Sequence, residues 1–180
     1  MTADADRLQL LRLARAAIVA HITGSATPRC DEGSLTARRG GAFVTIHNNG
    51  ELRGCIGHIE ADERLVDVVA RSAAAACSTD PRFAAVTASE LPDMEIELSL
   101  LGPLELIQGP DDIEIGRHGL VVEMGWHRGL LLPQVASEWK WDAEMFLAQT
   151  CHKAGLPRDA WKHHAKLWRF EAEVFREGEG

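Results

Sequence analysis

The sequence predicts an α+β fold. Segments with the two-residue hydrophobic period of strands occur in pairs joined by glycine-containing turns. Helical segments separate these pairs without the regular β-α-β alternation of a parallel sheet. The chain of 180 residues is 46% hydrophobic and 26% charged, which is enough apolar material for a core. We therefore expect antiparallel sheets with helices layered on them.

The first part of the chain predicts one helix followed by a hairpin. Apolar residues beginning at Leu8 recur at spacings of three and four over residues 8–22, as in an amphipathic helix that packs on a sheet. The period changes to two over residues 42–47 and again over residues 52–56. Asn48-Asn49-Gly50 between these two strands is a strong hairpin turn.

The middle of the chain predicts a second helix and a third strand. Apolar residues at helical spacing cover residues 65–76, and Asp62 precedes them as a candidate N-cap. Thr87 and Glu90 have the spacing of a capping box, which predicts a single helical turn. Residues 94–100 alternate apolar with polar side chains, which is typical of a half-buried strand.

A connection rich in proline, glycine and acids follows, and a second hairpin after it. Residues 104–107 are a candidate short strand within the connection. Residues 120–124 and 130–132 predict two strands around a turn that runs from Gly125 to Gly129.

A helix and a closing strand complete the chain. Asp142 is the expected N-cap of the helix, and residues 168–174 alternate as a strand. All five tryptophans, including Trp139 and Trp168, lie toward the C-terminal third, where we expect them to pack a small core rather than stack on bases.

Composition and charge exclude several classes of protein. The net charge of −8 disfavours nucleic-acid binding, since it repels phosphate backbones. No stretch approaches the roughly 20 apolar residues of a membrane span, and the acidic first residues do not fit a secretory signal. We expect a cytoplasmic protein without a membrane anchor.

The cysteines and histidines do not form a recognisable metal or disulfide motif. Cysteines stand at positions 30, 55, 77 and 151 without a Cys-x-x-Cys pair, and His-Glu-x-x-His does not occur. Glycine-rich phosphate-binding motifs are also absent from the sequence. The sequence therefore predicts neither a metal site nor a cofactor, and each thiol must be judged singly.

The hexapeptide Leu52-Arg-Gly-Cys-Ile-Gly57 is the most site-like segment. Strand alternation places Arg53 and Cys55 on one face, where the guanidinium favours a thiolate, while Gly54 and Gly57 leave room for a ligand or for another backbone. The alternative is structural: Cys55 is a small packed residue and the glycines are bulge or packing positions. The sequence leaves both open.

Three further side chains are candidates for the same chemistry. The sequence offers several histidines as a base for the thiol without fixing one: His47, His58, His118, His127 and His152. His118 precedes a strand between flexible residues, where a functional side chain can project, or else it is an ordinary surface histidine. Arg82, in Asp80-Pro-Arg-Phe83, can present its guanidinium to a carboxylate or phosphate, or pair with a local acid such as Asp80. Gln134 ends a strand with an amide that can position a substrate or cap the next turn.

The hexapeptide resembles the AMMECR family, the A component of the AmmeMemoRadiSam system. Further segments are similar to that family in the same order along residues 8–176. They are Gly41-Ala-Phe-Val-Thr, Asp80-Pro-Arg-Phe83, Met94-Glu-Ile-Glu-Leu-Ser99, Gly116-Arg-His-Gly-Leu120, Leu130-Leu-Leu-Pro-Gln-Val135 and Thr150-Cys-His-Lys-Ala-Gly-Leu156.

The resemblance implies two packed subdomains, each of mainly antiparallel sheet with helices on a face. We expect the larger at about residues 1–110 and 160–180 and the smaller at about 111–159, with the hexapeptide near a cleft between them. It also implies a radical-SAM protein and a Memo-like protein as partners. The reaction is not implied, so two hypotheses stand.

In the first hypothesis the protein is a cysteine-dependent enzyme that acts on a small polar metabolite. Cys55 is the nucleophile, Arg53 and His118 assist it, and Arg82 and Gln134 position the substrate, with Gly54 and Gly57 leaving space for it. In the second hypothesis the protein is a non-catalytic module that binds a metabolite or docks onto those partners.

Overall fold

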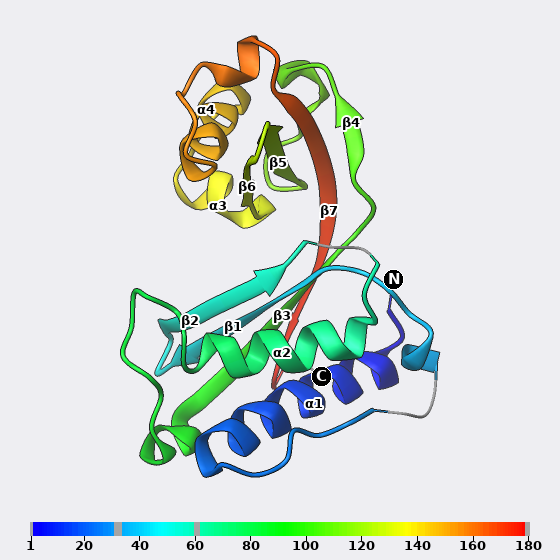
Figure 1. Cartoon of the computed structure of the whole chain (residues 1–180), viewed down its shortest axis with the longest axis vertical. Coiled ribbons are helices and arrows are strands. Elements are labelled where there is room, and N and C mark those ends of the chain that lie inside the picture. Colours follow the sequence, from blue (N-terminus) through cyan, green and yellow to red (C-terminus); the bar gives the residue numbers. More distant parts are fainter. Residues whose placement is uncertain (1, 31–33, 60–61, 179–180) are drawn as a thin grey trace. The chain divides into compact units, whose positions relative to one another are not determined.

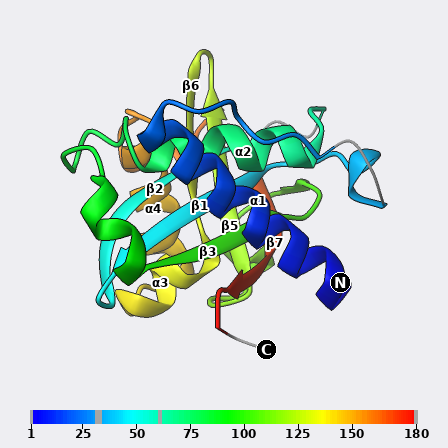
Figure 2. The same ribbon diagram turned by 90° about the horizontal axis from the view of Figure 1, so that it is seen from below.

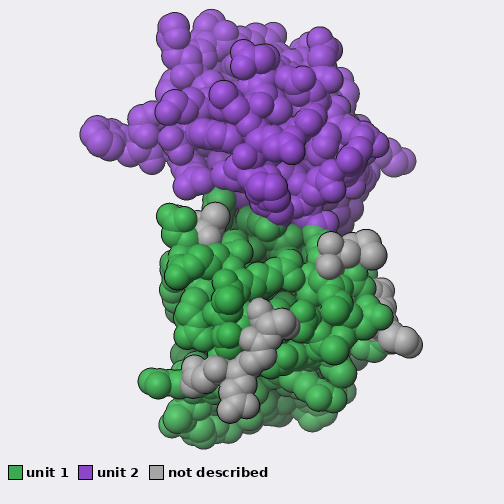
Figure 3. Space-filling view, turned by 90° about the vertical axis from the view of Figure 1, so that its right-hand side faces the viewer, with its two compact units in different colours: residues 1–101, 173–180 green, residues 102–172 purple. Residues whose placement is uncertain are grey.

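The computed structural model describes residues 2–30, 34–59 and 62–178, and its contacts divide the chain into two compact units (Figure 3). Unit 1 comprises Met1–Leu101 and Glu173–Gly180, and unit 2 comprises Gly102–Ala172. Unit 2 is thus longer than the subdomain expected at residues 111–159. The reason is that the strands on both sides of that stretch, β4 (Glu105–Ile107) and the first part of β7 (Lys166–Arg176), pair with each other.

The sheet of unit 1 is antiparallel, as predicted. Its strands are β1 (Ala42–Asn48), β2 (Glu51–His58) and β3 (Met94–Leu101), in the order β2-β1-β3, with β7 following β3 (Figure 1). The predicted hairpin between β1 and β2 is confirmed, and its turn contains Asn49 and Gly50, both with positive φ. The edge strand at this end of the sheet is β2, which carries the hexapeptide.

Two helices, α1 (Asp4–Thr23) and α2 (Leu65–Ala76), cover one face of this sheet (Figures 1 and 2). Their apolar stripes pack with alternate residues of the strands in one hydrophobic cluster, which includes Ile18, Val44, Ile46, Val69, Ile96 and Leu98. The prediction that Asp62 caps the second helix is wrong. The helix begins at Leu65, with Arg64 in the N-cap position and no side-chain cap.

Gly54 allows α2 to approach the edge strand. A Cβ atom at this position would lie 2.2 Å from the carbonyl oxygen of Ala76, the last residue of α2. Real Cβ atoms do not approach a backbone oxygen this closely, so only glycine permits the contact. Because Gly54 faces the helix layer, the next residue, Cys55, faces the opposite side of the sheet.

Unit 2 contains β4, the hairpin of β5 (His118–Met124) and β6 (His127–Leu131), and the helices α3 (Pro133–Glu138) and α4 (Ala143–Lys153). The candidate strand at residues 104–107 is confirmed as β4. The core of unit 2 is a separate hydrophobic cluster that includes Leu120, Val122, Phe146, Leu147 and Cys151. Short 3₁₀ helices connect the elements of the chain at Ser34–Thr36, Ala88–Asp93, Pro110–Asp112 and Ala160–Lys162.

The turn of the second hairpin differs from its prediction, whereas the start of α4 agrees with it. The hairpin turn consists of Gly125 and Trp126, not of five residues, because Arg128 and Gly129 pair with β5. Gly129 lies against α4, since a Cβ there would be 2.5 Å from the backbone nitrogen of Ala154. The predicted cap of α4 is confirmed: Asp142 accepts a hydrogen bond from the backbone N–H of Met145 at 2.8 Å.

The expectation that the tryptophans pack a core is only partly correct. Trp141 and Trp161 pack against the core of unit 2, but Trp139 is exposed, and Trp126 at the hairpin tip is 98% exposed. Tryptophan content predicts packing on average, but it does not show which rings lie at a turn. Among the described residues, no helix has the length and apolar composition needed to cross a membrane.

We predict that Gly54→Ala destabilises the protein by about 2–4 kcal/mol, because the new methyl group forces α2 away from β2. Urea unfolding measures the change. Gly109→Ala is the control, since a Cβ at Gly109 meets nothing within 4 Å and its φ of 175° is extended. Equal unfolding free energies for the two variants would show that Gly54 is not required for the packing.

Candidate functional site

Three polar side chains form a row across the face of the unit 1 sheet opposite the helices. Cys55 of β2 lies directly opposite Thr45 of β1, and Thr45 lies opposite Glu97 of β3. Directly opposed residues share a face of an antiparallel sheet, so the thiol, hydroxyl and carboxylate are neighbours. Thr45 Oγ1 donates a hydrogen bond to Cys55 Sγ at 3.3 Å. We call Cys55, Thr45 and Glu97 the polar row.

Asp80 and Arg82 close the edge of β2 at Cys55. The backbone N–H of Cys55 donates to Asp80 Oδ2 at 2.9 Å, and Arg82 Nη2 donates to the Cys55 carbonyl oxygen at 3.4 Å. The two side chains therefore take the place of a neighbouring strand at this residue. We call Asp80, Arg82 and the Cys55 backbone the edge clamp.

The clamp is held together by a buried carboxylate. Asp80 is only 4% exposed and accepts hydrogen bonds from Arg82 at its backbone nitrogen, Nε and Nη2, over 3.1, 2.9 and 2.7 Å. These bonds, with the N–H of Cys55, hold the pKa of Asp80 well below its usual range. The Asp80 carboxylate is therefore ionised at neutral pH.

The thiol of Cys55, in contrast, is protonated at neutral pH. Burial raises its pKa above the ordinary value, and the carboxylates of Asp80 and Glu97 add to this rise. The hydroxyl of Thr45 and the guanidinium of Arg82 oppose it, but less strongly. Cys55 as a residue is nevertheless only partly buried, so a ligand can approach it.

Arg53 was expected to favour the thiolate of Cys55, but its guanidinium is paired elsewhere. Its guanidinium donates to both oxygens of Glu90, at 2.7 and 3.3 Å, and to the carbonyl oxygens of Ala84 and Ala85. This pairing lowers the pKa of Glu90 to about 2. The cation that acts on the thiol is Arg82, which lies on the segment after α2 and not on the strand of Cys55.

The space beside the two glycines of the hexapeptide is filled by the protein itself. The end of α2 lies against Gly54, and a Cβ at Gly57 would lie 2.3 Å from the ring of Phe43. These contacts correspond to the packing alternative for both glycines and not to room for a substrate.

His118 and Gln134 belong to unit 2, whereas Cys55, Arg53 and Arg82 belong to unit 1. His118 is buried, and its Nδ1 accepts a hydrogen bond from the backbone N–H of Glu114 at 3.0 Å. Burial lowers the pKa of His118, so the imidazole is neutral with its proton on Nε2. Gln134 follows Pro133 in the first turn of α3, a helix that the sequence analysis did not predict.

The sequence alone does not identify Thr45, Glu97 or Asp80 as members of one site. Thr45 and Glu97 lie on predicted strands, but only the register shows that they flank Cys55. The pairing of Asp80 with Arg82 was one of the alternatives, whereas the bond from Asp80 to Cys55 joins residues far apart in sequence. Within the described ranges, no three side chains of His, Cys, Asp and Glu gather as a metal site would require.

The fold and the site define an α+β protein whose edge strand carries the hexapeptide and is clamped by the Asp-Pro-Arg-Phe segment. The sequence of the AMMECR1 family matches residues 11–175, so the chain belongs to the AMMECR1 family. This confirms the resemblance noted in the sequence.

Relatives and a solved structure agree with this assignment. A protein of Methanothermobacter thermautotrophicus is 45% identical over 177 residues, which cover 93% of this chain and 92% of that protein. A protein of Thermococcus onnurineus is 46% identical over 181 residues, covering 93% and 88%. The crystal structure of an uncharacterised protein of Pyrococcus horikoshii matches with a TM-score of 0.86 and 42% identity, covering 94% of this chain and 90% of that one.

We predict that Asp80→Asn destabilises the protein by about 2–3 kcal/mol at neutral pH, less than for a fully buried pair because Arg82 is half-exposed. Since the folded-state pKa of Asp80 is lowered, its contribution is present at neutral pH. It is lost as the pH falls below the unfolded value of about 3.9. Urea unfolding from neutral to acidic pH should therefore show a shallower decline for the variant than for the wild type.

Exposed Glu51 on the same strand provides the control for this prediction. Glu51→Gln should leave both the stability at neutral pH and the acid decline close to those of the wild type, because surface charges contribute little. An acid decline for Asp80→Asn as steep as that of the wild type would mean that Asp80 does not have the lowered pKa.

Proposed function

We propose that the protein binds a small anionic metabolite at Arg82, beside the protonated thiol of Cys55. The observation that carries this proposal is the way in which Arg82 is held. The Nε and Nη2 atoms of Arg82 donate hydrogen bonds to Asp80. The Arg82 side chain is nevertheless 54% exposed, and its Nη1 makes no hydrogen bond to any described residue. A fixed guanidinium with unused donors suits a carboxylate or a phosphate.

The polar row supplies further groups for such a ligand. The sulfur of Cys55 already accepts a hydrogen bond from Thr45, which leaves its own proton to donate. Ser99, two residues after Glu97 on the same face of β3, has a buried hydroxyl oxygen without a hydrogen-bond partner among the described residues. A buried hydroxyl usually has a partner, so a bound polar group or water at this face would satisfy it.

The raised pKa of Cys55 favours binding over nucleophilic catalysis. A thiol nucleophile reacts as the thiolate, and catalytic cysteines usually have lowered pKa values. In this site burial raises the pKa of the Cys55 thiol, and the carboxylates of Asp80 and Glu97 counteract part of the lowering by Arg82. Cys55 therefore acts as a neutral member of the binding site in this proposal.

A cysteine-dependent enzyme is the second candidate, and the placement of Glu97 favours it. The Cys55 thiol would transfer its proton to the Glu97 carboxylate, and the resulting sulfur anion would form a bond with an electrophilic carbon of the ligand. The negative charge that develops on the ligand would be stabilised by Arg82. This route requires the bound ligand to lower the thiol pKa. The expected association with a radical-SAM protein and a Memo-like protein stays a prediction.

We predict that iodoacetamide alkylates Cys55 more slowly at pH 7 than it alkylates N-acetylcysteine. The pH at which the alkylation rate reaches half of its maximum, here called the half-point, should lie above the ordinary thiol pKa of about 8.5. The rate is measured over a pH series by mass spectrometry of the peptide that contains Cys55. Thr45→Val should move the half-point further up, since the Thr45 hydroxyl lowers the thiol pKa. A plateau in the rate already below neutral pH would instead identify an activated nucleophile and favour the enzyme.

We predict that malonate and inorganic phosphate raise the melting temperature of the protein, while sodium chloride of equal ionic strength does not. A ligand that binds the folded state alone stabilises it in proportion to the logarithm of its concentration. Arg82→Gln should abolish the response and Cys55→Ser should retain it. The matched control is Arg53→Gln, because that guanidinium is already occupied by Glu90. An unchanged response in Arg82→Gln would exclude Arg82 as the anion site.

A further inference from the structure

Three aromatic rings lead from the core of unit 2 to its surface. Phe146 of α4 is fully buried, and the centroid of the Trp141 ring lies 6.5 Å from that of Phe146. Trp139 stacks on Trp141, with the ring centroids 6.1 Å apart and 18° between the ring planes. Trp139 is 68% exposed, so the ring face turned away from Trp141 is open to solvent. We call Trp139 and Trp141 the aromatic platform.

The turn that ends α3 holds the platform in place. Trp139 is the C-cap of the helix, and Lys140 after it has a left-handed φ of 53°, where glycine is the usual residue. The N–H of Lys140 donates to the carbonyl oxygen of Ser137 at 3.2 Å, and that of Trp141 donates to Ala136 at 2.9 Å. These are the two bonds of a Schellman motif. The outer ring is therefore fixed by the backbone as well as by the stack.

The residues around the platform are mostly acidic. Residues 138–144 contain Glu138, Asp142 and Glu144, and Lys140 is the one basic residue among them. Asp142 caps α4, but Glu138 and Glu144 are exposed and form no ion pair with any residue that the structure describes. Unpaired carboxylates beside an open aromatic face favour a cationic ligand.

The nearby cations of the chain itself do not fill this position. Arg117 follows Gly116, which lies against Ser137, but the Arg117 guanidinium is paired with Glu114 and Glu171. Lys140 is not placed over either ring, since the cation–π contacts of the described residues are at Phe83, Trp161 and Phe175. The open face of Trp139 thus has no cation from the described part of the chain.

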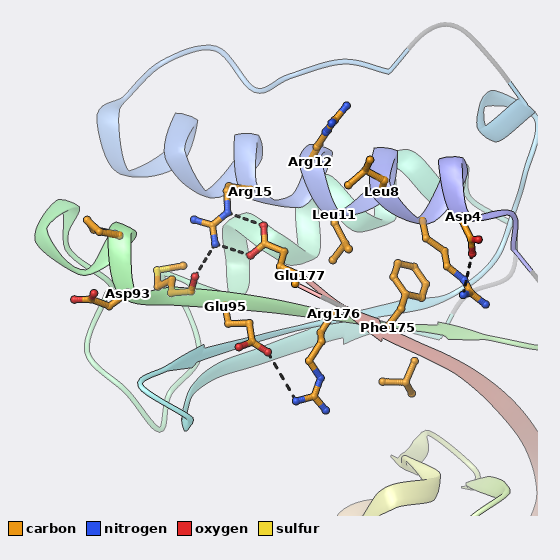
Figure 4. Close-up of a pocket in the computed structure, with 15 residues that line it drawn as sticks. Asp4, Leu8, Leu11, Arg12, Arg15, Asp93, Glu95, Phe175, Arg176 and Glu177 are labelled. Atoms are coloured by element: carbon orange, nitrogen blue, oxygen red, sulfur yellow. Dashed lines mark hydrogen bonds and ion pairs between the residues drawn. The ribbon is translucent and has the colours of Figure 1, made fainter. Parts of the chain in front are cut away.

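The groove between α1 and the end of β7 in unit 1, of about 1140 Å³, differs in this respect (Figure 4). Its Arg15 is paired with Glu177 at 2.5 Å, and its Arg176 is paired with Glu95 at 3.8 Å. Charges of both signs therefore neutralise each other there, and the groove favours no ligand charge. The carboxylates at the platform have no such partners.

The shape of the platform indicates a guanidinium that belongs to a larger molecule. Arginine stacks its planar cation on aromatic rings, and tryptophan is the most favourable ring for this contact. Small-molecule sites are concave and bury most of the ligand, whereas Trp139 is largely exposed. A cation bound only at this ring would keep most of its surface in water, so further contacts from the same molecule are needed.

We propose that the aromatic platform is the docking site for an arginine in a basic segment of a partner protein. The guanidinium stacks on the open face of Trp139, and Glu138 and Glu144 attract the positive charge of the segment. Met145, which is 42% exposed next to Glu144, offers apolar surface to the rest of the segment. This interaction is independent of the anion proposed at Arg82.

The test uses the full-length chain and a fluorescein-labelled, capped peptide of four Arg-Gly repeats at low ionic strength. Fluorescence anisotropy should show saturable binding, which Trp139→Ala weakens at least about tenfold. Glu138→Gln and Glu144→Gln should each weaken it about threefold. A peptide with neutral citrulline in place of arginine should bind at least about tenfold more weakly, and one with lysine at least about threefold more weakly.

The indole N–H signals of the five tryptophans give a second readout by nuclear magnetic resonance. Trp139→Phe identifies the signal of Trp139 while keeping an aromatic ring at that position. Addition of the Arg-Gly peptide should shift this signal and leave that of Trp126 in place.

Trp126→Ala is the matched control, because Trp126 is 98% exposed but lies on the β5–β6 hairpin and not in the platform. Glu51→Gln in unit 1 is the control for the loss of a carboxylate. Both should leave peptide binding unchanged, and thermal unfolding verifies that each variant is folded. If Trp139→Ala does not fold, Glu138→Gln, Glu144→Gln and the citrulline peptide decide the question. The malonate response at Arg82 should survive in all of these variants, which separates the two proposals.

Four results would overturn the proposal. They are an absence of binding by the Arg-Gly peptide, equal binding by the citrulline peptide, and binding of N-acetylarginine amide as tight as that of the Arg-Gly peptide, which would indicate a small metabolite. The fourth is concentration-dependent dimerisation of the wild type in sedimentation experiments that is lost in Trp139→Ala. That result would show that a second copy of the chain covers the platform in place of a partner segment.

Discussion

The hydrogen bonds of the Asp80 carboxylate are the interaction on which the site depends. A buried carboxylate is stable only when its oxygens are well paired, and Asp80 is paired by Arg82 and by the backbone N–H of Cys55. Gly54 makes this arrangement possible, since it lets the end of α2 approach β2 and so brings the following segment to the strand edge. The hexapeptide and the Asp-Pro-Arg-Phe segment thus form one structural unit, although they are distant in the sequence.

The same arrangement determines the chemistry of the thiol. An arginine near a cysteine lowers the thiol pKa only if its charge is not offset. Here burial is the largest influence on the thiol pKa and raises it, and the carboxylates of Asp80 and Glu97 counteract part of the effect of Arg82. The outcome is a neutral thiol beside a guanidinium that still has donors to offer. This combination is better suited to holding an anion than to attacking an electrophile.

Local patterns predicted most of the fold, and long-range contacts explain what they missed. The hairpin of β1 and β2, the capping box at Thr87 and the cap at Asp142 each depend on residues within a few positions of one another, and each is confirmed. Strand alternation also predicted that Arg53 and Cys55 share a face, but the β1–β2 register shifts at Arg53, which pairs with no residue of β1. Alternation could not show that Glu90, from another element, takes the guanidinium.

The exposed residues illustrate the same limit. Helical periodicity predicted that Leu8 belongs to the inward stripe of α1. The buried face of the helix is instead centred near Leu10, Ala14 and Ala17, and Leu8 lies to its side and is 49% exposed.

The β2 edge of the unit 1 sheet is protected at Cys55, and the way in which it is protected bears on function. Proteins protect sheet edges because unpaired N–H and C=O groups invite another chain. At β2 the protection comes from the chain itself, since Asp80 and Arg82 occupy the backbone groups of Cys55. Because these backbone groups are already occupied, this edge cannot accept another strand at Cys55 without breaking existing hydrogen bonds. The exposed guanidinium of Arg82 beside it is therefore placed to meet a small ligand and not a further strand.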